Sequence, residues 1–258
     1  MGRKVAVPLQ PRRIISLVPS QTELLHYFGL EDSVVGITKF CIHPKEWFEH
    51  KTRIGGTKNV NFNKVKALNP DLIIGNKEEN QKEDILELEK LTPVWMSDIS
   101  NMDQSYQMIH MLSQIVGESD KGTKLVADLQ KDFLEIKKLF SSSKFKKKVL
   151  YLIWRKPYMS IGSETFIHSI IEDYLQLENV LSNASRYPEV DLEKCPKPDY
   201  IFLSSEPYPF KAQHIKEIQD KFPESKVLLV DGEYFSWYGS RLLGASDYFK
   251  KLLKEMVF

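Results

Sequence analysis

The chain has few of the features that identify common protein classes. Its 258 residues include two cysteines, Cys41 and Cys195, which are too few for a disulfide framework and leave the redox compartment open. No apolar run approaches the roughly 20 residues that span a bilayer, so membrane insertion is not expected. The formal net charge is +1, from 36 basic and 35 acidic residues. This balance gives no electrostatic footprint for binding nucleic acid.

Several catalytic and targeting motifs are also missing. No glycine-rich dinucleotide fingerprint follows an expected strand, and P-loop, nucleophile-elbow and His-Glu-x-x-His patterns do not occur. These absences argue against a dinucleotide enzyme, a P-loop NTPase and an α/β-hydrolase. The first 20 residues carry basic side chains but no sustained apolar segment and no small-residue cleavage site. We therefore predict no export signal, which leaves a cytoplasmic location open.

The apolar residues predict an α/β fold. Runs of four to seven apolar residues alternate with segments of helical period, as in βαβ units with parallel sheets. A helix is expected over 22–28, where Ser20, Thr22 and Glu23 favour a capping box and Gly29 favours a C-terminal stop. The expected strands are 13–18, 34–38, 71–75, 94–97, 148–154, 179–181 (short and weaker), 200–204 and 226–230.

The two halves of the chain resemble each other. Both LNPDLIIGNKEEN, from Leu68, and PKPDYIFLSSEPY, from Pro196, have a Pro-Asp turn, a short apolar strand and a polar loop with a carboxylate. An internal duplication of one α/β lobe explains this similarity, and convergence on a common turn is the alternative. We predict an N-terminal lobe over 1–118, a bridging helix within 119–142 and a C-terminal lobe over 143–258.

A long helix is expected between these lobes. From Asp120 to Phe140 it would extend about 30 Å at ~1.5 Å per residue. Such a helix can reach both lobes and act as a stiff connection. The apolar residues that recur at steps of three and four, and so lie on one helix face, are Leu125, Leu129, Phe133, Ile136 and Phe140.

Ligands bind beyond the carboxyl ends of strands in open parallel sheets, so the residues that follow each strand are the site candidates. The stretch VDGEYFSWYGSRLLG, residues 230–244, places four aromatic residues between Glu233 and Arg241. Phe235 and Tyr234 could pack beneath this loop, and Arg155 and Arg241 could form structural ion pairs. An aromatic, amphipathic surface suits a large, flat ligand. The candidate contacts are Ser20, Phe40, Thr57, Lys58, Trp154, Arg155, Tyr158, Glu206, Tyr208, Glu233, Trp237 and Tyr238.

Cys41 and His43 form a Cys-x-His pair. In an extended segment both side chains point the same way, and sulfur with imidazole could ligate a metal or a metallated cofactor. A structural zinc site needs four ligands, and no second cluster with zinc-site spacing is visible. A Cys–His nucleophilic couple and simple packing in the core are the other interpretations.

These segments resemble a known family, the class III substrate-binding proteins of ABC importers, also called helical-backbone metal receptors. The similar stretches cover nearly the whole chain: RIISLVPSQTELLHYFGLEDSVVGIT, VNFNKVKALNPDLII, YMSIGSETFIHSII, SRYPEVDLEKCPKPDYIFLSSEPY and VDGEYFSWYGSRLL. The resemblance implies two Rossmann-like lobes bridged by one long helix, with a ligand cleft between the lobes. It also implies a monomeric, periplasmic protein that binds a cobalamin, haem or ferric siderophore and has no cofactor of its own.

The resemblance also implies roles for particular residues. In the cobalamin-binding branch aromatic side chains clamp the corrin, and Phe40, Trp237 and Tyr238 fall at or near those positions. Thr57 stands where that branch has a tryptophan, which weighs against cobalamin itself. The family docks on its membrane permease through one surface acid per lobe. Glu193 matches the second-lobe acid, whereas Asn63 occupies the first-lobe position.

We therefore predict a non-catalytic receptor for a metal complex, linked to ABC-type uptake. Trp154 and the other aromatic candidates would flank the ligand, and Lys58 and Arg155 would neutralise its carboxylates or phosphate. One alternative is a receptor for a free metal ion that uses Cys41, His43 and Glu233. Another is an intracellular relative that binds a metallated cofactor without taking part in transport.

Overall fold

The computed structural model describes residues 4–141 and 147–257, and the expected start of the C-terminal lobe at 143 lies outside them. The described residues form two compact units. Among these residues, every helix is too short or too polar to cross a bilayer. Of the described residues, unit 1 comprises 4–98, 103–128 and 238–241, and unit 2 comprises 99–102, 129–141, 147–237 and 242–257.

Unit 1 is built on a parallel sheet with the strand order β3-β2-β1-β6-β7. Its central strands are buried on both faces, which is why they read as continuous apolar runs in the sequence. A short antiparallel pair, β4 and β5, follows the edge strand. The strands are β1 (Ile14–Ser16), β2 (Val34–Ile37), β3 (Thr52–Arg53), β4 (Gly55–Gly56), β5 (Asn59–Val60), β6 (Leu72–Asn76) and β7 (Val94–Ser97).

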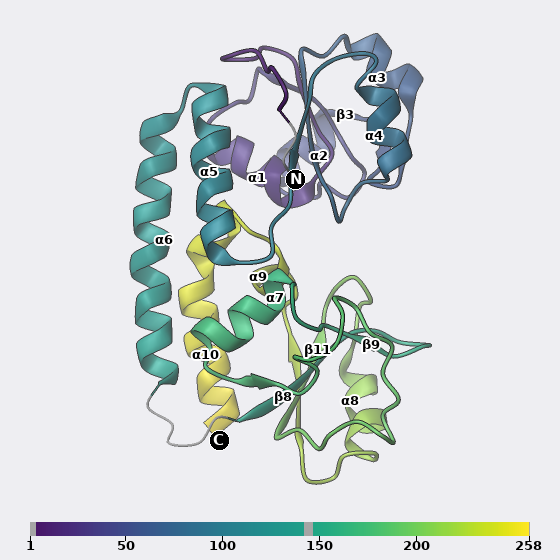
Figure 1. Cartoon of the computed structure of the whole chain (residues 1–258), viewed down its shortest axis with the longest axis vertical. Coiled ribbons are helices and arrows are strands. Elements are labelled where there is room, and N and C mark those ends of the chain that lie inside the picture. Colours follow the sequence, from purple (N-terminus) through teal and green to yellow (C-terminus); the bar gives the residue numbers. More distant parts are fainter. Residues whose placement is uncertain (1–3, 142–146, 258) are drawn as a thin grey trace. The chain divides into compact units, whose positions relative to one another are not determined.

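Helices cover both faces of this sheet (Figure 1). Val65 of α3 and Ile85 of α4 join Ile15 and Ile73 in one apolar cluster, so these two helices close the same face. The other face is covered by α1 and α5 (Figure 1). The helices of unit 1 are α1 (Pro19–Tyr27), α2 (Lys45–His50), α3 (Phe62–Leu68), α4 (Lys82–Leu88) and α5 (Met102–Val116).

Unit 2 repeats this plan with the parallel order β10-β8-β11-β12, and β9 pairs antiparallel with β8. Leu152 and Leu203 pack with Ile218 of α8 on one face of the sheet. Its strands are β8 (Lys148–Trp154), β9 (Met159–Ser160), β10 (Glu178–Asn179), β11 (Tyr200–Ser204) and β12 (Lys226–Val230). Its helical segments are α7 (Phe166–Ser169), the π-helix η1 (Ile170–Tyr174), α8 (Ala212–Gln219), α9 (Glu233–Ser236) and α10 (Ala245–Val257), while the 3-10 helix η2 (Ser240–Gly244) spans residues of both units.

The opposite face of the unit 2 sheet carries an aromatic core. Phe235, from the ring-rich stretch, is fully buried, and its ring centroid lies 5.1 Å from those of Tyr151 and Phe249. Tyr234 stacks on Tyr248 at 4.7 Å. Phe235 and Tyr234 therefore belong to the packed aromatic core. This is one of the two interpretations that the sequence left open for them.

The Pro-Asp turns that the halves share have the same geometry in both units. The backbone amide of Asp71 donates to the carbonyl of Arg13 (3.0 Å), and its carboxylate accepts from the Arg13 amide (3.0 Å). In unit 2 the amide of Asp199 donates to the Lys148 carbonyl (2.8 Å), and its carboxylate accepts from the Lys148 amide (2.7 Å). Each aspartate thus ties the start of one central strand to the start of its neighbour.

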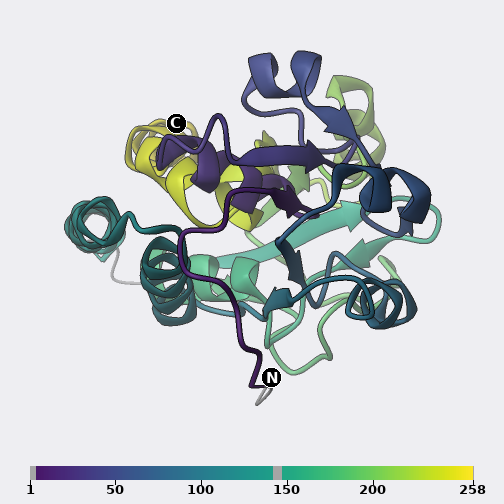
Figure 2. The same ribbon diagram turned by 90° about the horizontal axis from the view of Figure 1, so that it is seen from above.

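The long helix α6 (Ser119–Phe140) begins and ends within a residue of its predicted bounds. Its predicted apolar face is buried, and Phe133 contacts Tyr174 at 5.0 Å between ring centroids. Helices α5 and α6 run side by side, and Figure 2 views them nearly end-on. A Cβ at Gly122 of α6 would lie 2.1 Å from the Ser113 hydroxyl of α5, so this close approach requires glycine.

The predicted strands over 94–97, 148–154, 200–204 and 226–230 match β7, β8, β11 and β12 residue for residue. The strand expected over 179–181 lies slightly earlier, as β10. The predicted capping box was wrong. Helix α1 begins at Pro19 after Val18 with no side-chain cap, because proline at the first turn has no amide to satisfy. Gly29 does end the helix, with φ +84°.

The aspartate tie in unit 2 can be tested by replacing Asp199 with Asn. We expect the free energy of unfolding to fall by about 1–2 kcal/mol at pH 7, because a charged acceptor for the Lys148 amide is lost. Burial raises the pKa of Asp199, but the Lys148 amide and Lys147 outweigh it, so the net pKa is lowered. The contribution is therefore complete above about pH 4 and is lost as the pH falls through the folded-state pKa.

Urea denaturation from pH 7 to pH 2.5 measures this effect. The control is Glu224→Gln, which removes an ion pair with Lys197 whose side chains are both more than 80% exposed. Such a pair contributes little, so the control should change the unfolding free energy by less than about 0.5 kcal/mol. Equal effects of the two substitutions would contradict a stabilising role for the Asp199 tie.

Candidate functional site

The site candidates of unit 1 lie on loops that leave the carboxyl edge of its sheet. After β2 the chain reaches Phe40, whose side chain is 50% exposed, and the Lys39 ammonium lies 5.1 Å from the centroid of its ring. Thr57 is buried and Lys58 is exposed on the turn between β4 and β5. Among these predicted contacts, Phe40 and Lys58 are thus the accessible ones.

The end of the ring-rich stretch belongs to unit 1. Burial raises the pKa of Tyr238 far above its usual range, although hydrogen bonds with Ser97 and Ser20 lower it in part. The hydroxyl of this tyrosine therefore stays protonated and joins the end of β7 to the first turn of α1. Three residues on, Arg241 Nε donates to a Glu23 oxygen at 2.9 Å. Arg241 forms the structural ion pair that was one expectation for it.

Cys41 is sealed in the interior of unit 1. Its side chain is fully buried, and the Thr22 hydroxyl donates to its sulfur (3.1 Å) while the Thr38 hydroxyl lies 3.2 Å away. Burial raises the pKa of this thiol above its ordinary value, and the threonine hydrogen bonds only partly oppose the rise. A nucleophile or metal ligand needs the thiolate, so this environment suits packing better than chemistry. His43 is half-buried.

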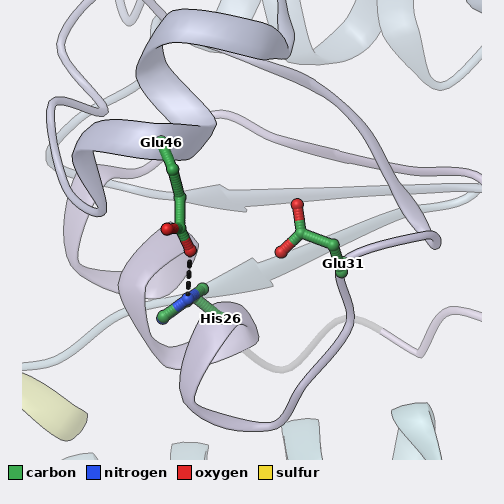
Figure 3. A group of neighbouring side chains, drawn as sticks. All are labelled: His26, Glu31 and Glu46. Carbon is green, nitrogen blue, oxygen red and sulfur yellow. Dashed lines mark hydrogen bonds and ion pairs between the residues drawn. The ribbon is translucent and has the colours of Figure 1, made fainter.

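A different trio, His26, Glu31 and Glu46, brings three possible metal ligands together in unit 1 (Figure 3). One ligand atom of each lies within 4.8 Å of the others. His26 Nε2 lies 3.0 Å from a Glu46 oxygen. The Trp47 indole donates to Glu31, and the Lys51 ammonium lies 3.6 Å from the Glu31 carboxylate. The polar atoms of these half-buried and exposed side chains therefore already have hydrogen-bond or ion-pair partners within the protein.

The carboxyl edge of the unit 2 sheet is aromatic. Trp154 ends β8 with 40% of its side chain exposed, and its ring lies edge-to-face with Tyr208 at 5.8 Å between centroids. Tyr208 follows β11 and also contacts Phe210 and His214. The predicted contacts Trp154 and Tyr208, which are far apart in sequence, therefore form one surface.

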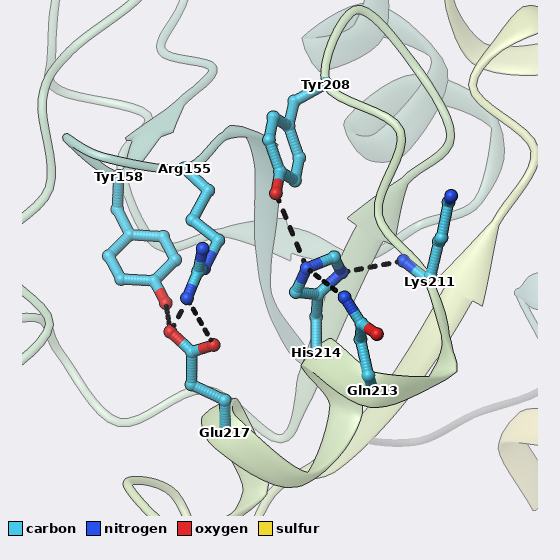
Figure 4. A network of polar contacts seen from close by, with 7 residues as sticks. All are labelled: Arg155, Tyr158, Tyr208, Lys211, Gln213, His214 and Glu217. Carbon is cyan, nitrogen blue, oxygen red and sulfur yellow. Dashed lines mark hydrogen bonds and ion pairs between the residues drawn. The ribbon is translucent and has the colours of Figure 1, made fainter.

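Arg155 lies next to this surface and is held by Glu217 of α8 (Figure 4). Its Nε donates to one carboxylate oxygen at 3.2 Å and its Nη2 to the other at 2.9 Å. The Tyr158 hydroxyl donates to the same carboxylate. This two-pronged geometry fixes the plane of the guanidinium. Arg155 is thus in an ion pair, as the sequence allowed, and its orientation is set before any ligand arrives.

The charges of this network are well defined. Hydrogen bonds from Arg155 and then Tyr158 lower the pKa of Glu217, and Glu217 in turn raises that of Arg155. Burial, followed by the bond to Glu217, raises the pKa of Tyr158 to about 12. The Lys211 amide donates to His214 Nδ1 (2.8 Å), so His214 Nε2 carries the hydrogen that faces Tyr208 at 3.4 Å. At neutral pH, Tyr158 is therefore uncharged.

A second polar group of unit 2 surrounds Glu206. Ser236 donates to one of its oxygens, and the Trp237 indole donates to the other at 3.3 Å. Trp237 is 8% exposed, so its ring is largely enclosed. Glu233, at the start of α9, is half-buried. These contacts fix Glu206 and Trp237 against each other in unit 2.

The two predicted docking positions are on the surface. Glu193 is exposed, and its amide donates to Asp191 in a local turn. Asn63 is exposed on α3. Sequence reasoning missed Glu217 and His214, whose partners Arg155 and Tyr208 come from other elements. The spacing of Glu217 and His214 on one face of α8 was visible, but no local signal indicated what this face meets.

Comparison with known proteins identifies the family of this chain. A family model described as periplasmic binding protein matches residues 14–228, well over half of the chain. The chain belongs to the periplasmic binding protein family.

Curated relatives of this family member carry names that describe binding. The vitamin B12-binding protein of Vibrio parahaemolyticus serotype O3:K6 is 25% identical over 196 residues, covering 74% of this chain and 70% of that protein. A Bacillus subtilis protein named uncharacterized ABC transporter substrate-binding lipoprotein YvrC is 29% identical over 177 residues. That match covers 66% of this chain and 56% of the relative.

Solved structures show the same fold. The periplasmic vitamin B12-binding protein BtuF of Vibrio cholerae matches with a TM-score of 0.80 and 21% identity, over 97% of this chain and 99% of that one. The periplasmic heme-binding protein RhuT from Roseiflexus sp. RS-1 gives 0.78 and 16%, over 95% and 97%. The petrobactin-binding protein YclQ from Bacillus subtilis gives 0.76 and 20%, over 97% and 92%.

The buried state of Cys41 predicts its reactivity. In the folded protein, Cys41 should be alkylated at least about tenfold more slowly than half-buried Cys195, since a fully buried thiol is inert. Peptide mass spectrometry after timed iodoacetamide treatment measures both rates in one sample. In denaturant the two rates should become similar. Faster native alkylation of Cys41 would favour a nucleophilic role after all.

Proposed function

We propose that the chain is a non-catalytic substrate-binding protein for a metal complex and serves an ABC-type importer. The ligand would be a corrinoid, a haem-like ring or a ferric siderophore, the classes expected from the sequence. The names of the relatives support this proposal. Within the chain, the observation that carries it is the surface of Trp154, Tyr208 and Arg155 at the carboxyl edge of the unit 2 sheet. Ligands of open parallel sheets bind at this edge.

The unit 2 residues have complementary roles in this proposal. Trp154 offers a half-exposed flat face for stacking on a broad ring. Arg155 gives two of its five N–H donors to Glu217 and also bonds to the Tyr158 and Tyr208 side chains, and its fixed positive charge would attract a carboxylate or phosphate of the ligand. Tyr158 and Tyr208 border this donor. Glu206, Glu233 and Trp237 form the second polar part of the edge.

The unit 1 residues add a smaller apolar surface and a cation. Phe40 would stack on the ligand, and Lys58 would neutralise an anionic group on it. The side chains of Ser20 and Tyr238 are hydrogen-bonded to each other, so their hydroxyl groups would contact the ligand together. Thr57, which is buried, would contribute least.

The transport part of the proposal rests on the relatives and on Glu193. Its exposed carboxylate is available to a permease, whereas Asn63 offers only a neutral amide in unit 1. Docking would therefore depend more on unit 2 than in a protein with an acid in each unit. Relatives named periplasmic or lipoprotein support a location outside the cytoplasmic membrane.

A receptor for a free metal ion is the second candidate. It would use Cys41, His43 and Glu233, but the buried, protonated state of Cys41 disfavours it. Elemental analysis of protein purified with and without a chelator separates the two functions. A stoichiometric metal that the chelator removes, with no chromophore, would favour the free-ion receptor.

The proposed function predicts binding of a coloured ligand. Thermal-shift and absorption screening with cyanocobalamin, haemin and ferric siderophores should identify one ligand that raises the unfolding temperature. Trp154→Ala should then weaken its binding by about 1–3 kcal/mol, because a stacked ring is lost. Leu134→Ala, which trims an exposed apolar side chain on α6, is the matched control and should leave the dissociation constant unchanged. If none of the complexes binds, the proposed function is wrong.

A further inference from the structure

The loop between β6 and α4 is fixed more firmly than a surface connection requires. Asn76 ends β6 and is buried, and its side-chain oxygen accepts from the amides of Glu78 (2.8 Å) and Glu79 (3.3 Å). Its side-chain nitrogen donates to the carbonyl and hydroxyl oxygens of Ser97 at the end of β7. One asparagine thus sets the backbone of the loop and joins it to the neighbouring strand.

A second buried asparagine closes the loop. The Asn80 side-chain oxygen accepts from the Asn76 amide at 2.8 Å, and its nitrogen donates to the Thr57 carbonyl at 3.0 Å. The loop is therefore attached to the β4–β5 turn as well as to β7. Fully bonded buried networks of this kind hold side chains in one position, which binding sites require.

The side chain that this network holds is Glu79. It is half-buried, and no hydrogen bond joins its carboxylate to another residue in 4–141 or 147–257. Burial raises the pKa of this carboxyl, the charge of Lys58 lowers it and that of Glu78 raises it. A partly buried acceptor without a donor destabilises a fold, so stability does not explain a rigid loop that holds it there.

The surroundings of Glu79 are those of a binding edge. The charge of Glu79 raises the pKa of Tyr238 and of Cys41, both in unit 1. Glu79 follows β6, so it lies at the carboxyl edge of the sheet. The Lys58 side chain is exposed to solvent. A ligand group can therefore approach the Glu79 carboxylate beside this cation.

We propose that Glu79 is a ligand-contacting residue that determines specificity and accepts hydrogen bonds from a donor group of the ligand, such as a primary amide or an ammonium. This inference rests on the proposed function and narrows its ligand class. A corrinoid presents primary amides at its periphery, which donate two N–H groups each. A haem presents propionate carboxylates, which Glu79 would repel. Glu79 therefore favours an amide-bearing metal complex over a carboxylate-bearing one.

The binding test compares Glu79→Ala with Glu78→Gln, which changes the adjacent carboxylate on the same loop. Dissociation constants for cyanocobalamin and haemin are measured by tryptophan fluorescence. We expect Glu79→Ala to bind cyanocobalamin about tenfold or more weakly, since a charged acceptor is lost, and to bind haemin no more weakly than the wild type. The control should change either value by less than about threefold. Wild-type binding of cyanocobalamin that Glu79→Ala leaves unchanged would overturn the role of Glu79 and leave the proposed function standing.

A ligand-free measurement tests the same inference. Because its pKa is raised in the folded state, ionised Glu79 opposes folding at neutral pH, and this effect vanishes as the pH falls below the unfolded-state value of about 4.3. Glu79→Gln should therefore raise the unfolding temperature by about 2–4 °C at pH 7.5 and by much less at pH 4.5. A lower unfolding temperature for Glu79→Gln would show a structural carboxylate and overturn the inference. Binding of no complex by the wild type would overturn the proposed function, and with it the ligand class assigned to Glu79.

Discussion

The parallel pairing of the central strands is the constraint on which the rest of the chain depends. Asp71 bonds reciprocally to Arg13, the residue before β1, and Asp199 to Lys148, the first residue of β8, so that β1 and β6, and likewise β8 and β11, start at nearly the same level. Parallel strands that start at one level send the loops that follow them to the same edge of the sheet. Each unit therefore collects its polar loops at one edge, and residues far apart in sequence, such as Trp154 and Tyr208, come into contact there.

Sequence reasoning recovered this frame because the frame depends on local apolar runs and turns. The strand over 226–230 and the buried face of α6 follow from periodicity alone. It failed where a side chain had a distant partner. Glu23 was assigned to a capping box, but it pairs with Arg241, 218 positions away. Glu217 had no local signal for its pairing with Arg155. For Cys41, spacing left packing, a metal site and a nucleophile open, because spacing does not reveal burial.

The ring-rich stretch shows how one segment serves two purposes. Phe235 belongs to the aromatic core of unit 2, while Trp237 binds Glu206 and Tyr238 bonds to Ser97 in unit 1. The clustering of rings in the sequence was visible, but the division of labour among them was not. It arises because a short helix, α9, presents successive residues to different neighbours. Packing of Phe235 fixes the helix, and the helix then fixes the polar contacts of the residues that follow.

The shared frame also explains why the two edges differ in chemistry. After β6 the chain enters a loop closed by Asn76 and Asn80, and this polar network supports a carboxylate. After β8 it turns back into β9, and this hairpin exposes Trp154 and directs Arg155 toward Glu217. The strand order constrains where these loops lie and leaves their composition free. Two lobes built on one plan can therefore keep the same aspartate ties while one edge carries a carboxylate and the other an aromatic surface with a guanidinium donor.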